Sequence, residues 1–322
     1  MRNKPILIVA GEPESIFFEI FFKSLKLRKY KSPIILIASE KFLKLNMKKF
    51  RFKSSIKLLD FKKLDEYNLN NKSINLINVD YNFRRKFKDK SQITNNYIKK
   101  CFEISFKILK SKITNKFING PINKTTFLNN RYLGITEFIT DKVNKKATAM
   151  LIYNKEISVC PLTTHLPLKL VSKKINQKSI EEKTILINNF FKKEIGFTPK
   201  IAVTGLNPHC ENILKINEET KIIRKEIKKL KKKGFKIYGP FPADTIFLKQ
   251  NRNKFNVILG MYHDQVLTPM KTLFEYDAIN ITLGLPIIRI SPDHGPNVGM
   301  LGKNKSNPLS LLKAINFLDK LK

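Results

Sequence analysis

The alternation of strand and helix patterns along the chain predicts an α/β fold with a largely parallel sheet. Short apolar segments alternate with longer amphipathic ones, and several apolar segments run directly into polar loops that contain Gly or Pro. The 322 residues, 42% of them hydrophobic, suffice for one large domain or two ordinary ones. A smaller second domain fits this pattern, and no linker marks its boundary.

The individual elements follow from the apolar periodicity. Strands are predicted at residues 5–10, 33–39, 75–80, 148–153, 157–162, 200–206, 235–239, 256–261 and 279–290. Helices are predicted at residues 14–27, 93–111, 178–193, 217–233 and 306–321. The Lys-rich part of the fourth helix, residues 221–233, has apolar residues at helical spacing, which indicates an amphipathic helix with a solvated basic face. A helix that binds nucleic acid is the alternative interpretation.

The net charge of the chain is strongly positive, at +36. The 62 Lys and Arg residues are spread along the whole chain, and Lys, Asn, Ile and Phe, whose codons are rich in A and T, are abundant together. This pattern favours compositional drift over a nucleic-acid-binding surface, which would predict salt-sensitive binding to polyanions. A basic cleft would still attract a phosphorylated substrate and an anionic cofactor.

No export or membrane signal is evident in the sequence. The first apolar segment, residues 6–10, is too short for a signal peptide, and no segment approaches the ~20 apolar residues of a membrane helix. We therefore expect a cytoplasmic protein that does not contact membranes. The three cysteines, Cys101, Cys160 and Cys210, form no CxxC pair, which argues against a disulfide framework or a thiolate zinc site.

The four histidines have an unusual distribution, since each is expected in a loop at the end of a strand. They are His165, His209, His263 and His294. Ligands bind beyond the carboxyl ends of strands in open α/β sheets. The first three histidines follow apolar strands directly, and three imidazoles with an open fourth position suit a catalytic divalent metal. A hydrogen-bonded loop histidine is the alternative at each position.

Charged residues near these histidines are further candidates. Asp264 follows His263 directly, and Asp244 lies in the segment PADT; either could orient a histidine or contact a substrate. Asp244 could instead be a helix N-cap. Arg289 lies near the end of a strongly apolar strand, where a charge is costly without a partner, so it suits a phosphate or carboxylate ligand.

Ordered motifs along nearly the whole chain resemble those of the 4-hydroxythreonine-4-phosphate dehydrogenase family. The motifs are GEP (11–13), NGPINK (119–124), TEF (136–138), TTHLPL (163–168), GLNPH (205–209), GPFPADT (239–245) and MYHDQ…K…NITLGLP.IR.SPDHG (261–295). The resemblance implies an α/β fold of the isocitrate/isopropylmalate dehydrogenase type. In that fold, two intertwined α/β domains, here within residues 1–322, enclose the active site in the cleft between them.

The resemblance also implies roles for individual residues. The family's metal ligands correspond to His165, His209 and His263. Its substrate contacts correspond to Thr136, Lys271, Asn280 and Arg289. Its nucleotide loop corresponds to His294 and Gly295. Lys271, Asp244 and Asp264 are the candidate catalytic residues. The implied assembly is a homodimer whose subunits share the metal site. No GxGxxG motif follows a strand, so an ordinary Rossmann site is not indicated.

The implied reaction is oxidation of 4-phosphooxy-L-threonine, a small phosphorylated substrate, by NAD or NADP. One divalent metal (zinc, magnesium, cobalt or manganese) would assist as a Lewis acid. The 3-keto acid that forms would lose carbon dioxide to give 3-amino-2-oxopropyl phosphate, a precursor of pyridoxal phosphate. Lys271 is expected to assist deprotonation or bind the phosphate, and Arg289 and Asn280 to anchor the charged ends of the substrate.

Some positions depart from the family pattern. Ile135 replaces a histidine before the TEF motif, residues 14–17 replace a glycine-rich segment, and residues 296–299 differ after the HG pair. Cys210 follows His209 and is either a packed thiol or a soft extra ligand. These departures leave open a related substrate such as phospho-threonate or phospho-erythronate.

Overall fold

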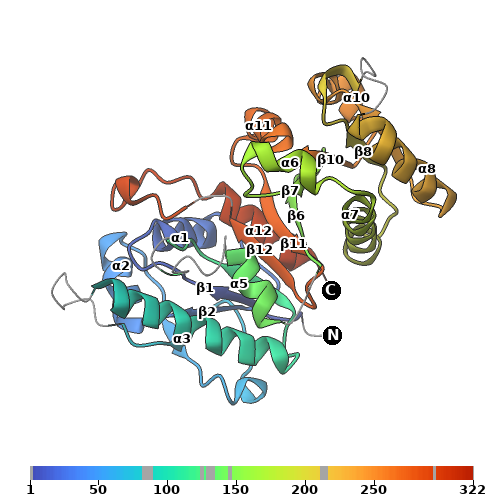
Figure 1. The fold of residues 1–322 in the computed structure, drawn as a ribbon. Coiled ribbons are helices and arrows are strands. Elements are labelled where there is room, and N and C mark those ends of the chain that lie inside the picture. Colours follow the sequence, from blue (N-terminus) through green and yellow to red (C-terminus); the bar gives the residue numbers. More distant parts are fainter. Residues whose placement is uncertain are drawn as a thin grey trace. The chain divides into compact units, whose positions relative to one another are not determined.

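The computed structural model describes residues 3–81, 90–123, 127, 135–143, 147–210, 217–292 and 295–321. The chain divides into two compact units. Unit 1 comprises Met1–Val143 and Pro286–Lys322, and unit 2 comprises Asn144–Leu285. Each unit contains a sheet with helices packed against it (Figure 1), as the α/β prediction requires.

The described strands of unit 1 form a parallel sheet in the order β3-β4-β2-β1-β5-β12. Their bounds are β1 (Ile6–Val9), β2 (Ile34–Ala38), β3 (Ile56–Leu58), β4 (Ile74–Asn78), β5 (Lys116–Asn119) and β12 (Ile288–Pro292). The residues of β1 and β2 are all buried, which is the pattern expected of parallel strands covered on both faces.

Helices cover both faces of the unit 1 sheet (Figure 1). The helices are α1 (Phe17–Leu27), α2 (Glu40–Lys49), α3 (Lys90–Lys110), α5 (Ile135–Lys142) and α12 (Leu309–Lys320). Helices α1 and α12 pack against each other, while α3 contacts β1 and β2. The rings of Phe102 in α3 and Phe138 in α5 lie 5.6 Å apart between centroids. This aromatic contact holds α5, which carries Thr136, against α3.

The described strands of unit 2 have the order β11-β6-β7-β10-β8-β9. Their bounds are β6 (Ala149–Tyr153), β7 (Ser158–Thr163), β8 (Ile201–Thr204), β9 (Ile237–Phe241), β10 (Val257–Tyr262) and β11 (Ile279–Leu283). Strands β7, β10, β8 and β9 are parallel, whereas β6 is antiparallel to both of its neighbours. The parallel strands therefore end at one edge, where His165, His209 and His263 follow them.

The helices of unit 2 include several single turns. They are α6 (Val171–Lys174), α7 (Gln177–Phe190), α8 (Arg224–Lys232), α9 (Ala243–Ile246), α10 (Lys249–Arg252) and α11 (His263–Phe274). Helix α11 buries Val266 and Met270, one turn apart, in the core of the unit. Helix α8 buries Ile227 and Leu230 while its lysines face outward, which confirms the amphipathic interpretation. No helix in these described ranges is long and apolar enough to cross a membrane.

The structure corrects several element predictions. The apolar segment 279–290 is not one strand, because Gly284 has a φ of 87° and Pro286 follows, so the chain turns between β11 and β12. Helices α2, α5 and α11 and strands β3 and β5 were not predicted. Helix α11 contains Pro269, which reads as a helix breaker, and α2 buries only Leu43 and so has little apolar periodicity.

Candidate functional site

The predicted substrate residues of unit 1 come together around Arg289, which is 0% exposed in β12. Its Nε atom donates a hydrogen bond to Oδ1 of Asn119 at 2.8 Å, and its Nη1 atom donates to Oγ1 of Thr136 at 3.0 Å. Asn119 ends β5, which pairs with β12, so the sheet register brings the amide to the guanidinium. Two polar groups thus fix the plane of the buried guanidinium.

Burial lowers the pKa of Arg289 to about 10, and the nearby carboxylate of Glu137 opposes this shift. The guanidinium therefore stays charged at neutral pH. Arg289 is the second residue of β12, so it lies near the start of this strand and not near its end as predicted, and its side chain reaches Asn119 at the carboxyl end of β5. A buried, oriented cation of this kind suits a phosphate or carboxylate. Asn119 was missed by the sequence analysis because an Asn before Gly-Pro reads as a turn residue; its position at a strand end was the available signal.

The loop after β1 lies beside the loop after β5. A Cβ atom at Gly11, which has a φ of 78°, would lie 2.4 Å from the carbonyl oxygen of Pro121, so only glycine fits. The backbone N–H of Glu12 donates to the same oxygen at 2.8 Å. The N–H of Ile16 donates to the carbonyl of Pro296 at 3.2 Å. The segment after Gly295 therefore lies near the start of α1, whereas His294 lies outside the described residues.

Two of the predicted metal ligands in unit 2 lie close together. Strands β7 and β10 pair in parallel with Thr163 opposite Tyr262, so the residues that follow them meet at one edge. The ring centroids of His165 and His263 are 6.1 Å apart. His263 was predicted to lie in a loop, but it is the first residue of α11. Its Nδ1 atom lies 2.6 Å from Oδ1 of Asp264, within hydrogen-bond distance.

His209 lies in a short 3-10 turn after β8. His165 and His209 have positive φ angles of 52° and 58°, and Cys210 has 56°. Such backbone is uncommon for residues other than glycine and concentrates at functional sites. The described residues contain no group of three or more His, Cys, Asp or Glu side chains gathered for a metal ion. Of the three predicted ligands, His165 and His263 are thus brought together and His209 does not complete a group with them.

The remaining candidates of unit 2 occupy separate elements. Asp244 is exposed in the first turn of α9, but the N-cap of that helix is Pro242, so the N-cap interpretation is wrong. Lys271 lies in the last turn of α11, where burial lowers its pKa although part of the side chain is exposed. Asn280 lies in β11, and its buried Oδ1 atom accepts no hydrogen bond from the described residues. Cys210 is buried, and burial raises the pKa of its thiol.

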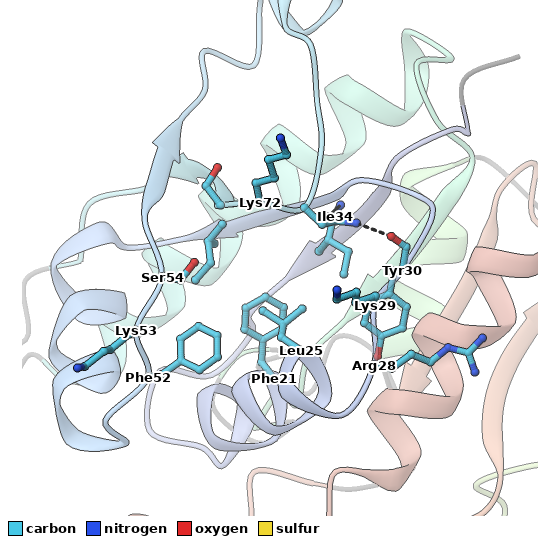
Figure 2. A pocket seen from close by; sticks show the side chains of 13 residues that line it. Phe21, Leu25, Arg28, Lys29, Tyr30, Ile34, Phe52, Lys53, Ser54 and Lys72 are labelled. Carbon is cyan, nitrogen blue, oxygen red and sulfur yellow. Dashed lines mark hydrogen bonds between the residues drawn. The ribbon is translucent and has the colours of Figure 1, made fainter.

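A hollow of about 480 Å³ lies elsewhere on unit 1 (Figure 2). Figure 2 shows Phe21, Leu25 and Phe52 facing one another inside it. Ile34 and Ile74, the first residues of β2 and β4, also line it, so it lies at the amino ends of the strands. None of the predicted site residues is among its described lining residues. The candidate site at the carboxyl ends of the strands is therefore identified by its side chains and not by the size of this hollow.

These features define an α/β protein with a buried, hydrogen-bonded arginine in one unit and strand-end histidines in the other. Residues 29–318 match the family described as pyridoxal phosphate biosynthetic protein PdxA. A 4-hydroxythreonine-4-phosphate dehydrogenase of Sulfurihydrogenibium sp. is 36% identical over 327 residues, covering 98% of each chain. A D-threonate 4-phosphate dehydrogenase of Pectobacterium atrosepticum is 37% identical over 200 residues, 61% of each chain.

The fold comparison agrees with the sequence comparison. The crystal structure of 4-hydroxythreonine-4-phosphate dehydrogenase from Klebsiella pneumoniae superimposes with a TM-score of 0.82 at 26% identity, covering 98% of both chains. The chain therefore belongs to the PdxA family and is an oxidoreductase. The family resemblance and fold class predicted from the motifs are confirmed.

Proposed function

We propose that this enzyme oxidises the C3 hydroxyl of 4-phosphooxy-L-threonine with NAD(P)+, in the biosynthesis of pyridoxal 5'-phosphate. The hydride leaves C3 for the nicotinamide and the hydroxyl proton leaves to a base, which gives the 3-keto acid. Loss of carbon dioxide from that acid gives 3-amino-2-oxopropyl phosphate. The observation that carries the proposal is the buried Arg289, held by Asn119 and Thr136 in a family whose named relatives act on phosphorylated substrates.

Arg289 is proposed to bind one charged end of the substrate. A guanidinium that is already oriented by two hydrogen bonds loses little side-chain entropy when it binds an anion. Asn280 is proposed to bind another polar group of the substrate, since a buried amide oxygen without a donor gains from one. Its acceptor would suit the substrate's ammonium or hydroxyl group.

The donor set at the strand ends of unit 2 fits a divalent metal. His165, His209 and His263 would hold it, and Asp264 would keep the Nδ1 atom of His263 protonated so that Nε2 is left for the metal. When bound, the metal supplies Lewis acidity at the hydroxyl oxygen, and NAD(P)+ accepts the hydride. Imidazoles accept zinc, cobalt and manganese among others. A homodimer that shares this site is proposed from the family resemblance alone.

Lys271 is the proposed proton acceptor. Partial burial of its amine lowers the pKa of Lys271, although the residue as a whole is exposed, and a lowered pKa favours the neutral amine that a proton acceptor needs. Asp244 and Asp264 are exposed carboxylates and are proposed to assist by orienting groups rather than by taking the proton. For the cofactor, Gly295 and His294 remain the proposed nucleotide loop.

Oxidation of phospho-threonate or phospho-erythronate is the second candidate function. Phospho-threonate is favoured by the Pectobacterium relative, which is 37% identical over its matched part, whereas the Sulfurihydrogenibium relative is 36% identical over nearly its full length. Ile135 also favours it, because this residue precedes Thr136 in α5 and can offer no hydrogen bond to an amino group.

Steady-state rates of NAD(P)H formation on the three substrates, with added divalent metal, separate the two candidates. The proposal expects 4-phosphooxy-L-threonine to have the highest kcat/KM. A higher value on either of the other two substrates would move the assignment to that substrate. Ile135→His is the matched variant: under the second candidate it would shift the preference toward the amino substrate.

A further inference from the structure

We propose that Glu219 and Gln265 form a clamp that holds the turn containing His209 to the end of β10, and that this clamp pre-organises His209 as a metal ligand. The second part rests on the proposed function; the first does not. Both residues are positioning residues, because neither is proposed to touch the substrate, the cofactor or the metal.

Gln265 ties the ends of two neighbouring strands together. Its Oε1 atom accepts hydrogen bonds from the N–H of Met261 and from Oγ1 of Thr204, both at 2.7 Å. Its Nε2 atom donates to the carbonyl oxygen of Gly205 at 2.7 Å. Met261 lies in β10, and Thr204 and Gly205 lie at the end of β8. The segments that lead to His263 and to His209 are thus joined by one amide group.

Glu219 fixes the same turn from the other side. Its carboxylate is 0% exposed and accepts hydrogen bonds from the N–H groups of Leu206 and Asn207 at 2.7 and 2.9 Å. The side-chain Nδ2 of Asn207 donates to its second oxygen at 2.9 Å. Burial acts to raise the pKa of Glu219, but the hydrogen bonds from Asn207 and Leu206 outweigh it and the pKa is lowered. The buried group is therefore a stable carboxylate.

The clamped turn is one that would not hold its shape unaided. His209 and Cys210 are consecutive residues with positive φ angles, and this conformation is unfavourable for any residue with a side chain. A backbone of this kind persists where its surroundings hold it in place. Glu219 anchors the turn before His209, and the guanidinium of Arg224 donates to the carbonyl of Cys210 after it, at 3.3 Å.

Histidine NMR tests the clamp directly. The chain has only four histidines, so protein labelled with ¹³C-histidine gives few ring signals, and His209→Gln assigns the one of interest. In metal-free Glu219→Gln and Gln265→Met proteins, we expect the His209 signal to shift or broaden while that of His165 is unchanged. Divalent zinc or cobalt is then titrated into each protein by calorimetry, and we expect its affinity to fall roughly 10–100-fold in both variants.

Two control variants in unit 1 remove the same chemical groups as the clamp variants do in unit 2. Glu19 is 2% exposed and accepts a hydrogen bond from the N–H of Ser306 at 2.6 Å, so Glu19→Gln removes a comparable buried carboxylate. Gln92 donates a side-chain bond to Asn96, so Gln92→Met is the matched amide control. Both controls should lower thermal stability or leave it unchanged without altering the His209 signal or metal affinity.

The outcomes separate the clamp from the proposed function. An unchanged His209 signal in both clamp variants would overturn the clamp, whatever the metal does. A changed signal with undiminished metal affinity would overturn the pre-organising role. If the unaltered protein binds no metal but the clamp variants still perturb His209, the clamp stands and the metal-dependent function fails.

Discussion

The two units carry their candidate functional groups in opposite physical states. In unit 1, Arg289 is fully buried and hydrogen-bonded to Asn119 and Thr136, so its orientation is set by the folded core. In unit 2, His165 and His209 are exposed and lie on left-handed backbone, and Asp264 beside His263 is 79% exposed. Folding alone therefore orients the guanidinium of Arg289. The side chains of His165 and His209, by contrast, are not held by burial.

The largest expected effect comes from removing the buried guanidinium of Arg289. Arg289→Lys keeps the charge but loses the planar donors to Asn119 and Thr136. Hydrogen bonds to charged groups contribute about 1.5–3 kcal/mol each. We therefore expect kcat/KM to fall roughly 100-fold, measured as NAD(P)H formation. Arg252→Lys, whose guanidinium donates to the carbonyl of Phe247 in unit 2, is the control. Normal kcat/KM in folded Arg289→Lys protein would show that the buried guanidinium does not bind the substrate.

The next effect concerns His263, the half-buried histidine at the end of β10. Asp264→Asn weakens the contact to Nδ1 of His263 and should reduce divalent-metal affinity roughly 10–100-fold, measured by calorimetry. Asp60→Asn, in unit 1, is the control for loss of an exposed carboxylate. If Asp264→Asn binds metal as tightly as the unaltered protein, the carboxylate does not orient the imidazole.

The next prediction is the dependence of kcat on pH, which tests Lys271 of unit 2. The pKa of Lys271 is lowered from its usual 10.5 by burial. If the neutral amine accepts the proton, kcat rises as pH rises through this lowered pKa, and Lys271→Gln removes that limb of the profile. The profile of Lys183→Gln, a lysine on α7, should match that of the unaltered enzyme. An unchanged profile in Lys271→Gln would assign the proton to another group.

The smallest effect is expected at Cys210. This thiol is buried and its pKa is raised, so it should be a packed, protonated side chain rather than a metal ligand. Cys210→Ala should cost about 1 kcal/mol of unfolding free energy, measured with denaturant, and leave metal affinity unchanged. A fall in metal affinity would make the thiol a ligand.

The sequence predicted the parts of this fold that depend on burial. Parallel strands such as β1 and β2 are continuous apolar segments, and their predictions overlap the observed strands. Helix α11 was not predicted, because Pro269 lies inside it, although Val266 and Met270 are buried and Leu267 and Phe274 pack against the same core. The segment 279–290 was joined into one strand, because apolar character alone does not reveal the turn at Gly284.

The candidate site divides in the same way. Arg289 stood out because a charge in an apolar strand requires a partner. The motif resemblance gave Thr136 as a substrate contact, and the structure shows that Thr136 also accepts a hydrogen bond from Arg289. Asn119 was not predicted, because its contact with Arg289 depends on the pairing of β5 with β12, which connects residues far apart in the chain. The contacts of Gln265 with Gly205 and of Glu219 with Leu206 were not predicted either, because each joins segments that come together only in the folded chain.

The most direct measurement of the central claim is NAD(P)H formation from 4-phosphooxy-L-threonine with added divalent metal, with EDTA, and in His263→Ala protein. We predict turnover that EDTA abolishes, that re-added metal restores in the unaltered enzyme, and that falls roughly 100-fold in His263→Ala protein. Turnover that survives both EDTA and the substitution would contradict the assignment of the strand-end histidines to a metal.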